Sequence, residues 1–301
     1  MISNFKELIE SAKAKGPKRI VVSGGEDFVA IEALKWASEI GLIEPILVGN
    51  EEKIKEAVGR AGHESRTRIT KFEIVDVTQE EIPVKSAELV GKGKADILMK
   101  GKISSSSFLR GVLDKDAGLR TNKILSHIAV IESPLYHKLL LVTDGGMIIK
   151  PDLQSKCDIL MNAVQLAHTL GIECPKVAIL SAVETVNPDM QDSLDAACLS
   201  KMGERGQFSK CKVEGPLALD LAISKEACEL KGIKSEVAGD SDILLMPDIA
   251  CGNISAKSMV WLGGAKIGGI VAGARAPCVM LSRADSKETK LNSIALGVIS
   301  S

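Results

Sequence analysis

Short apolar runs alternate with amphipathic segments along almost the whole chain. The runs rich in Val, Ile, Leu and Ala have the length of buried strands, at 18–23, 45–49, 72–77, 95–100, 127–132, 138–143, 176–181, 211–214, 242–246, 269–273 and 277–281. Segments with the apolar spacing of a helix lie between them, at 28–40, 51–61, 81–93, 105–113, 155–170, 189–203, 217–231, 255–265 and 286–297. This alternation predicts an α/β fold built on parallel strands.

The alternation is interrupted between 127–132 and 138–143, which are joined by Ser133-Pro134-Leu135-Tyr136. That connection is too short for a helix, so the two runs are predicted to pair antiparallel. A polar, irregular connector at 118–122 precedes them and indicates a domain boundary near residue 125. The length of 301 residues is about twice that of a usual domain, so two domains are expected.

Composition narrows the class of protein. A net charge of −1 argues against nucleic acid as the main partner, and no apolar run approaches the roughly 18 residues of a membrane span. The first residues lack the layout of a signal peptide, so a cytoplasmic protein is expected. The seven cysteines include no Cys-x-x-Cys pair and the four histidines show no ligand spacing. We therefore expect reduced thiols and no bound metal.

The clearest candidate for anion binding follows the run 95–100. Lys100 and Lys102 come directly before a serine run that starts at Ser104, and Arg110 lies one turn into the following helix. Ammonium groups beside the N-terminus of a helix form a site suited to phosphate. A solvated turn with a serine cap explains the same residues equally well. The spacing does not match a Walker P-loop.

Two further strand ends carry polar residues. Asp144 begins an Asp-Gly-Gly turn after the run 138–143, and ordinary turn chemistry explains it as well as ligand binding does. Asp248 and Asn253 lie in a segment expected to be a polar loop after the run 242–246. Cys251, in the same loop, has no histidine near it in sequence, so we do not favour it as a nucleophile.

The last strand run is followed by Ser282 and Arg283. A serine hydroxyl can stabilise an oxyanion forming on a carbonyl, and an arginine can hold a phosphate through two hydrogen bonds. Asp285 with Glu288 fits the cap of the next helix, with an acid three residues on. For Asp285, a capping role is as well supported as catalysis.

These segments together resemble the phosphate acetyl/butyryl transferases, which exchange an acyl group between coenzyme A and inorganic phosphate. The resemblance spans essentially residues 18–300 and is carried by 95–102, 127–152 with its Leu-Val-Thr-Asp-Gly-Gly-Met core, 175–178, 215–220, 247–253 and 281–286. The Gly-Pro-Leu-Ala-Leu-Asp motif and the short chain resemble those of the butyryl branch of the family rather than those of the acetyl branch.

The resemblance implies two α/β domains of the isopropylmalate dehydrogenase type with an interdomain cleft. The first would comprise 1–126 plus 272–301 and the second 127–271. It also implies homodimers or larger assemblies, acyl-CoA and phosphate as substrates, and no bound cofactor. Ser282 and Arg283 would perform the chemistry by direct transfer in a ternary complex, and Arg110 matches a second family arginine after a one-residue gap.

The family aspartate proposed as the base corresponds here to Thr289, which does not accept a proton at neutral pH. Asp285 and Glu288 are the candidate replacements, with Asp285 expected one helical turn before it on the same face. Lys100, Lys102, Ser104, Arg110, Asp144, Asp248 and Asn253 are the expected phosphate- or coenzyme A-binding residues.

Three other activities fit the sequence less well. Acetyl-CoA as the acyl donor is the first alternative. A nicotinamide-dependent dehydrogenase of the same fold is the second, although Asp144, Asp220 and Asp248 do not form the metal-binding pair that it needs. A coenzyme A sensor without activity is the third, and the Ser282-Arg283 pair argues against it.

Overall fold

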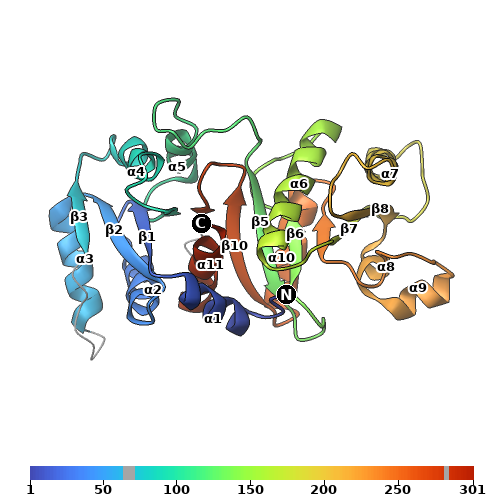
Figure 1. The fold of residues 1–301 in the computed structure, drawn as a ribbon, viewed down its shortest axis with the longest axis horizontal. Coiled ribbons are helices and arrows are strands. Elements are labelled where there is room, and N and C mark those ends of the chain that lie inside the picture. The colour runs from blue at the N-terminus through green and yellow to red at the C-terminus, as the bar shows by residue number, and fades with distance from the viewer. Residues whose placement is uncertain (64–71, 281–284) are drawn as a thin grey trace. The chain divides into compact units, whose positions relative to one another are not determined.

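In the computed structural model the chain forms an α/β fold with two compact units (Figure 1). The structure describes residues 1–63, 72–280 and 285–301. Unit 1 comprises residues 1–5 and 124–267, and unit 2 comprises residues 6–123 and 268–301. The C-terminal segment of the chain thus completes the unit that contains most of the N-terminal segment.

Unit 2 is built on a mostly parallel sheet. The strands lie in the order β3-β2-β1-β4-β11-β10. Their bounds are β1 (Lys18–Ser23), β2 (Ile43–Gly49), β3 (Glu73–Asp76), β4 (Ile97–Lys100), β10 (Lys266–Ala272, in unit 2 from Gly268) and β11 (Cys278–Val279). Neighbours from β3 to β11 are parallel, and β10 is antiparallel to β11. The carboxyl ends of β1, β4 and β11 therefore lie at the same edge of the sheet.

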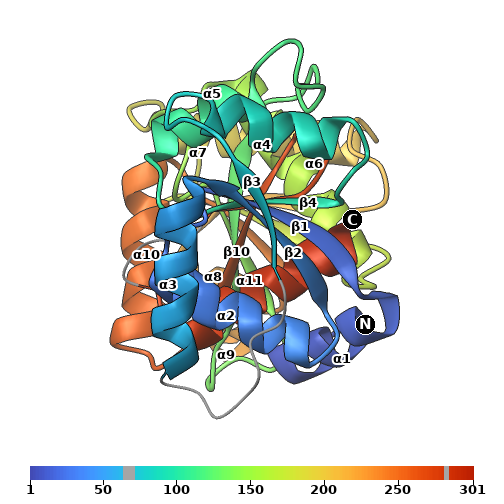
Figure 2. The same cartoon turned by 90° about the vertical axis from the view of Figure 1, so that its left-hand side faces the viewer.

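Helices cover both faces of this sheet (Figure 2). They are α1 (Phe5–Lys15), α2 (Phe28–Glu39), α3 (Glu51–His63), α4 (Ile82–Gly91), α5 (Ser105–Val112) and α11 (Lys287–Ser300). α2 packs against α3 and α11, whereas α4 packs against α5. Sequence periodicity did not single out α1, although its buried residues Phe5, Leu8 and Ala12 have helical spacing.

Within unit 1 the strands lie in the order β5-β6-β9-β7-β8. The bounds are β5 (Ser126–Glu132), β6 (Leu140–Thr143), β7 (Lys176–Leu180), β8 (Lys212–Leu217) and β9 (Ile243–Leu245). β5 and β6 pair antiparallel, which confirms the hairpin predicted from their short connection. The remaining neighbours are parallel.

The helices of unit 1 correct two sequence predictions. They are α6 (Leu153–Thr169), α7 (Gln191–Glu204), α8 (Leu219–Ile223), α9 (Lys225–Lys231) and α10 (Ile249–Trp261). The helix predicted at 217–231 is broken at Ser224, which ends α8 and caps α9 by accepting from Ala227 N. The helix predicted at 255–265 begins earlier, at Ile249, because Asp248 caps it.

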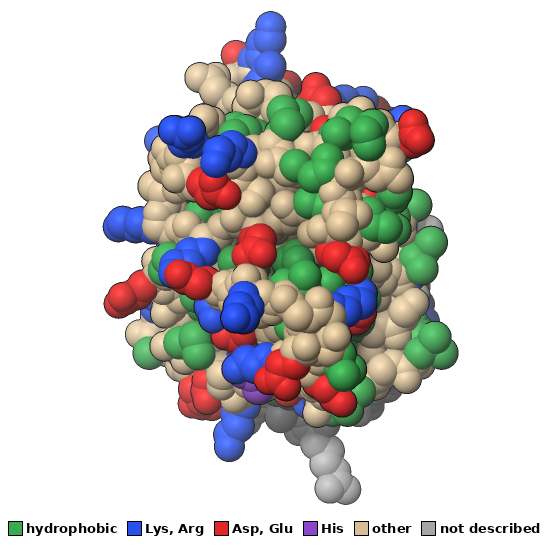
Figure 3. Space-filling model, turned by 90° about the vertical axis from the view of Figure 1, so that its right-hand side faces the viewer, with side chains coloured by type: hydrophobic (Ala, Val, Ile, Leu, Met, Phe, Trp, Pro, Cys, Tyr) green, Lys and Arg blue, Asp and Glu red, His purple; other side chains and the backbone are tan. Residues whose placement is uncertain are grey.

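The core consists of aliphatic side chains, mainly those of the strands. In unit 1 one cluster joins the sheet to α8 and α10 through residues such as Leu244, Leu221 and Ala256. Acidic and basic side chains are interspersed on the face drawn in Figure 3. Ion pairs of unit 1 include Lys212 with Glu236 and Lys231 with Asp220. None of the described helices is long and apolar enough to cross a membrane.

Candidate functional site

The turn after β4 holds the first two predicted anion-binding residues. Lys100 ends the strand, is 8% exposed, and its Nζ donates to the Gly101 carbonyl at 3.4 Å. The next two N–H groups bind the turn after β1: Gly101 N donates to Ser23 O at 2.9 Å and Lys102 N donates to Gly24 O at 2.8 Å. The two turns thus form one backbone unit, with a buried cation and the exposed Lys102 on it.

The serine run starts α5. Ser104 is the N-cap, and its Oγ accepts from Ser107 N at 3.0 Å. The same hydroxyl donates to Ser107 Oγ at 2.8 Å and is 2.9 Å from Ser106 Oγ. The predicted serine cap is confirmed. Because the hydroxyls of Ser104 and Ser107 remain at the surface of the helix start, capping does not prevent them from contacting a ligand.

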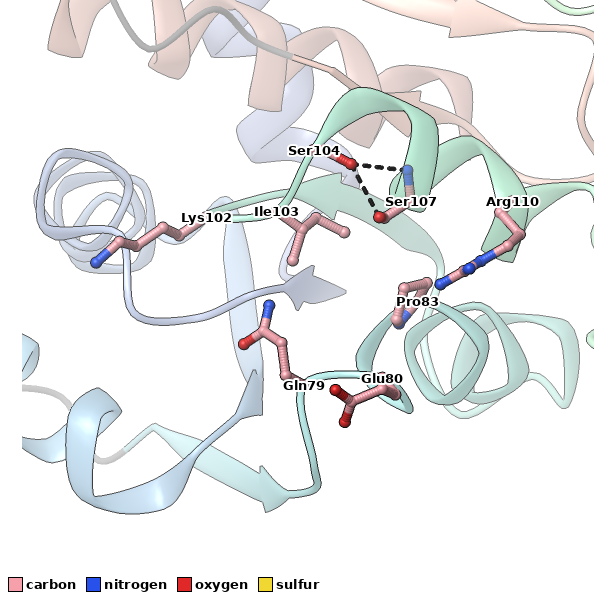
Figure 4. A pocket seen from close by; sticks show the side chains of 8 residues that line it. All are labelled: Gln79, Glu80, Pro83, Lys102, Ile103, Ser104, Ser107 and Arg110. Carbon is pink, nitrogen blue, oxygen red and sulfur yellow. Dashed lines mark hydrogen bonds between the residues drawn. The ribbon is translucent and has the colours of Figure 1, made fainter.

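A pocket of about 370 Å³ lies between the start of α4 and the start of α5 (Figure 4). Its lining contains three predicted residues, Lys102, Ser104 and Arg110, together with Gln79, Glu80, Pro83, Ile103 and Ser107. In Figure 4 the serines line one side and Gln79 and Glu80 the other, while the Arg110 guanidinium reaches toward Pro83. Two cations and several hydroxyl or amide donors make this pocket suited to an anion.

Gln79 and Glu80 were not predicted. They carry no motif, but they follow β3, a parallel strand whose carboxyl end lies at the same edge as those of β1 and β4. Ligands bind outside the carboxyl ends of strands in open α/β sheets. The position of Gln79 and Glu80 directly after a predicted parallel strand is therefore the sequence signal that could have identified them.

The other group of predicted binding residues lies in unit 1. The Asp144 carboxylate is 3% exposed and accepts four backbone N–H groups: Gly146 at 2.7 Å, Met147 at 2.9 Å, and Ile148 and His127 each at 3.3 Å. These bonds occupy the acceptor capacity of a carboxylate. The Asp144 carboxylate therefore stabilises the conformation of the loop that follows β6.

That loop lies directly against the start of α10. Asn253 Nδ2 donates to Gly145 O at 3.0 Å, and a Cβ placed on Gly252 would be 2.5 Å from Asp144 O. Asp248 caps α10 by accepting from Cys251 N at 2.8 Å. The prediction of a polar loop at 248–253 is wrong, because this cap and the close packing of Gly252 allow the helix to begin there. Asp144, Asp248 and Asn253 are thus brought together.

Cys251 is a poor candidate for a nucleophile. Partial burial of its sulfur raises the pKa of the Cys251 thiol, and the hydrogen bond and charge of Asp248 raise it further. A thiol with a raised pKa carries little thiolate at neutral pH. All seven cysteines are free.

Ser282 and Arg283 lie outside the described residues. Asp285 is half-buried, and its carbonyl oxygen accepts from Lys290 Nζ at 2.9 Å. The helix cap is Ser286, whose Oγ accepts from Thr289 N at 3.1 Å, so the predicted cap at Asp285 is wrong. Asp285 consequently lies before α11, not one turn earlier on a helical face, whereas Glu288 is exposed in the first turn.

Within residues 1–63, 72–280 and 285–301, no three His, Cys, Asp or Glu side chains come close enough together to hold a metal ion.

The class of protein follows from comparison with known sequences and structures. Residues 63–298 match the sequence profile of the family described as Phosphate acetyl/butaryl transferase. The match covers well over half of the chain, and the chain belongs to this family. The resemblance seen in the sequence is confirmed.

Individual relatives agree with that assignment. The chain is 45% identical to a phosphate butyryltransferase of Clostridium acetobutylicum over 99% of its own length and 98% of the relative's. It is 42% identical to a phosphate acetyltransferase of Thermotoga maritima, with 98% and 99% covered. A crystal structure of a branched-chain phosphotransacylase from Enterococcus faecalis V583 superposes with a TM-score of 0.82 at 31% identity, covering 94% of this chain and 98% of that one.

Proposed function

We propose that the protein exchanges a short acyl group, butyryl or similar, between coenzyme A and inorganic phosphate by direct transfer in a ternary complex. The observation that carries the proposal is the pocket of Lys102, Ser104 and Arg110 in a chain of this family. Acetyl is the alternative acyl group, since similar relatives carry both names. A dehydrogenase reaction is not favoured by these relatives.

The reaction needs an electrophilic carbonyl and a nucleophile held in line. Phosphate oxygen attacks the thioester carbonyl, a tetrahedral oxyanion forms, and the C–S bond breaks to release coenzyme A as thiolate. In reverse, the thiolate attacks the acyl phosphate. We assign oxyanion stabilisation to Ser282 and phosphate binding to Arg283, and proton transfer at the thiol to Asp285 or Glu288. Holding both substrates together supplies much of the acceleration.

We assign the pocket of unit 2 to a phosphoryl group of a substrate. Arg110 offers a planar fork of donors, Lys102 a mobile ammonium, and Ser104 a hydroxyl at a helix N-terminus, where anions are favoured. Lys100 adds a buried cation, whose charge is screened little by solvent.

In unit 1 we assign substrate binding to the paired loop and helix start. Asp144 would act by holding the loop in shape, while Asp248 and Asn253 fix the start of α10 against it. Backbone groups and side chains of this surface would then contact the remainder of the substrate.

We further propose that the protein works in the cytoplasm as a homodimer or larger homo-oligomer. Its partners would be acyl-CoA and phosphate, without nucleic acid or membrane, and coenzyme A would enter as a thioester substrate with no resident cofactor. Free, scattered cysteines support a reducing compartment.

Thiol release from a panel of acetyl- to valeryl-CoA, with and without phosphate, tests the activity and the acyl preference. We expect phosphate-dependent release that is fastest with a four-carbon or branched acyl group. Arg110→Ala should raise the KM for an anionic substrate by about tenfold or more, and the distant surface variant Lys55→Ala should not. The absence of phosphate-dependent release with every short acyl-CoA would refute the proposal.

A further inference from the structure

Ser23, the last residue of β1, has a buried hydroxyl. The residue is 0% exposed, and its Oγ has no hydrogen-bond partner among the residues that the structure describes. Buried polar groups in folded proteins are nearly always hydrogen-bonded, because desolvation without a partner costs free energy. An alanine would fill the same space without that cost. The hydroxyl therefore suggests a use beyond packing.

The register partner of Ser23 on β4 is a lysine, Lys100. Ser23 and Lys100 are register partners on the parallel strands β1 and β4, whose backbones are about 4.8 Å apart. Register partners on parallel strands direct their side chains to the same face of the sheet. A hydroxyl-bearing residue and a lysine that is 8% exposed are therefore neighbours at the carboxyl edge of the sheet.

The turns behind this pair are fixed by backbone contacts. Gly24 N and Gly25 N both donate to Val48 O at 3.0 Å, and Lys102 N donates to Gly24 O at 2.8 Å. A Cβ on Gly24 would lie 2.9 Å from Ile103 Cγ2, and Ile103 lines the pocket described above. Ser23 thus ends a strand whose following residue, Gly24, packs against a residue of the pocket lining. Rigid support of this kind is what a precisely placed ligand donor needs.

The acidic residue of the same turn lies on the other side of β1. Glu26 Oε1 is 3.7 Å from a Cβ placed on Gly49, at the end of β2, whereas Lys100 ends β4. Because β1 lies between β2 and β4, the carboxylate near the end of β2 and Lys100 at the end of β4 lie on opposite sides of that strand. An anion beside Lys100 is therefore not placed against Glu26.

We propose that Ser23 is a further substrate-binding residue, whose Oγ donates to a phosphoryl oxygen that Lys100 Nζ also binds. The identity of the substrate rests on the proposed function, whereas the binding of an oxyanion by Ser23 and Lys100 does not. The phosphoryl oxygen belongs either to inorganic phosphate and the acyl phosphate or to coenzyme A. A hydroxyl and an ammonium recognise both sources through the same hydrogen bonds.

Ser23→Ala tests the proposal against a matched control in the same unit, Ser300→Ala, because Ser300 Oγ is also buried and without a described partner. Steady-state kinetics would give the KM for phosphate and for acyl-CoA separately. Thermal unfolding would be followed alone, with inorganic phosphate and with coenzyme A. We expect Ser23→Ala to raise one KM by about tenfold. A rise for phosphate identifies inorganic phosphate as the ligand, and a rise for acyl-CoA identifies coenzyme A.

The ligand-free Ser23→Ala protein should unfold at the same or a higher temperature, because an unpartnered hydroxyl has been removed. Its stabilisation by the ligand should be smaller than that of the wild type, while Ser300→Ala keeps the full shift. Unchanged KM values, or equal changes in the two variants, overturn the proposal. Ser23→Cys, which has a similar volume and a weak donor, replaces Ser23→Ala if that variant does not fold.

The unfolding measurements separate this proposal from the proposed function. If the wild type releases no thiol, the function fails, and the shifts caused by phosphate and coenzyme A still decide the role of Ser23. Equal shifts in wild type and Ser23→Ala, or no shift of the wild type with either ligand, overturn it.

Discussion

A Cβ placed on Gly101 would lie 2.1 Å from the carbonyl oxygen of Gly24. The turns that follow β1 and β4 therefore meet backbone to backbone, and only a glycine at 101 permits that approach. The contact brings the hydrogen bond from Lys102 N to Gly24 O into place and positions the start of the pocket.

Gly101→Ala should separate these two turns. We expect a loss of stability of about 1–3 kcal/mol from overpacking and a larger relative loss of phosphate-dependent thiol release, because Lys100 and Lys102 move with the turn. Denaturant unfolding and steady-state kinetics measure the two effects.

Gly59→Ala is the matched control, since Gly59 lies within α3 and a Cβ there meets no atom of the described residues within 4 Å. It should gain about 0.5–1 kcal/mol from helix propensity and keep its activity. A Gly101→Ala protein with wild-type kinetics would show that the turns do not position the site.

The carboxylate of Glu80 lines a pocket that otherwise presents cations and neutral donors. Glu80→Gln should strengthen binding of an anionic substrate, because a like charge is removed. Since Glu80 is exposed, the gain should be at most about fivefold in KM. It should shrink as salt is added.

Gln79→Glu provides the opposite change in the same pocket and should raise the same KM. Kinetics of both variants at low and high salt would measure the pair of effects. Changes in the same direction, or no change in either variant, would contradict an anion in this pocket.

Lys156 and Asp195 form a buried ion pair between α6 and α7, with Nζ 2.7 Å from Oδ2 and both side chains at most 9% exposed. Gln191 Nε2 donates to the other carboxylate oxygen at 2.8 Å. Asp195→Ala should destabilise the protein by about 3–5 kcal/mol, because it leaves an uncompensated buried ammonium. Denaturant unfolding measures the loss.

The double variant Lys156→Met/Asp195→Leu should recover most of that stability, since it buries no charge. Glu204→Gln removes the charge of Glu204 from its exposed ion pair with Lys201 and should have no measurable effect on stability. A double variant as unstable as Asp195→Ala would show that the ion pair itself is required.

Asp240 should make stability depend on pH in the acidic range. Burial raises the pKa of its carboxyl, but the hydrogen bonds and charges of Lys176 and Lys138 outweigh burial and lower that pKa from 3.8 to about 2. A carboxyl whose pKa is lower in the folded than in the unfolded protein stabilises the fold at pH values above its unfolded-state pKa. That stabilisation is lost as the pH falls through the folded-state pKa. This carboxylate should therefore contribute about 2 kcal/mol at neutral pH.

Asp240→Asn should lower stability at pH 7 and flatten the change between pH 4 and pH 2. Unfolding measured across that range checks both effects, with the exposed Asp116→Asn as control. An unchanged slope would mean that other carboxyls carry the acid dependence.

Most of the fold could be predicted because buried strands and amphipathic helices leave distinct periods in the sequence. The start of α10 could not, since Cys251-Gly252-Asn253 has the composition of a turn. The packing of Gly252 against the Asp144 loop is a tertiary contact, and it overrides local propensity. The break at Ser224 could not be predicted either, because a single serine both ends α8 and caps α9.

Some residues of the candidate site could also be predicted from the sequence, and others could not. Lys102, Ser104 and Arg110 could be predicted because their residue types and strand-end position together suggest an anion. Glu80 could not be predicted, because its place in the pocket depends on where β3 ends in space. The missing partner of the Ser23 hydroxyl depends on burial, which the sequence does not specify.

The two candidate bases differ in their surroundings. Asp285 is half-buried and its main chain is held by Lys290, whereas Glu288 points from the first turn of α11 as an exposed side chain. A base must be within hydrogen-bond reach of the proton that it takes, and Asp285 is nearer in sequence to Ser282 and Arg283 than Glu288 is. We therefore expect Asp285→Asn to lower kcat by about a hundredfold or more, and Glu288→Gln to lower it only slightly.

Thiol release measured from pH 5 to pH 9 checks this assignment. If Asp285 is the base, Asp285→Asn should also remove the acidic limb of the kcat/KM profile, and Asp285→Glu should restore part of the rate. A large effect confined to Glu288→Gln would transfer the role to that residue. If both variants retain wild-type kcat, the thiol needs no carboxylate base, and its ionisation must come from the neighbouring cations alone.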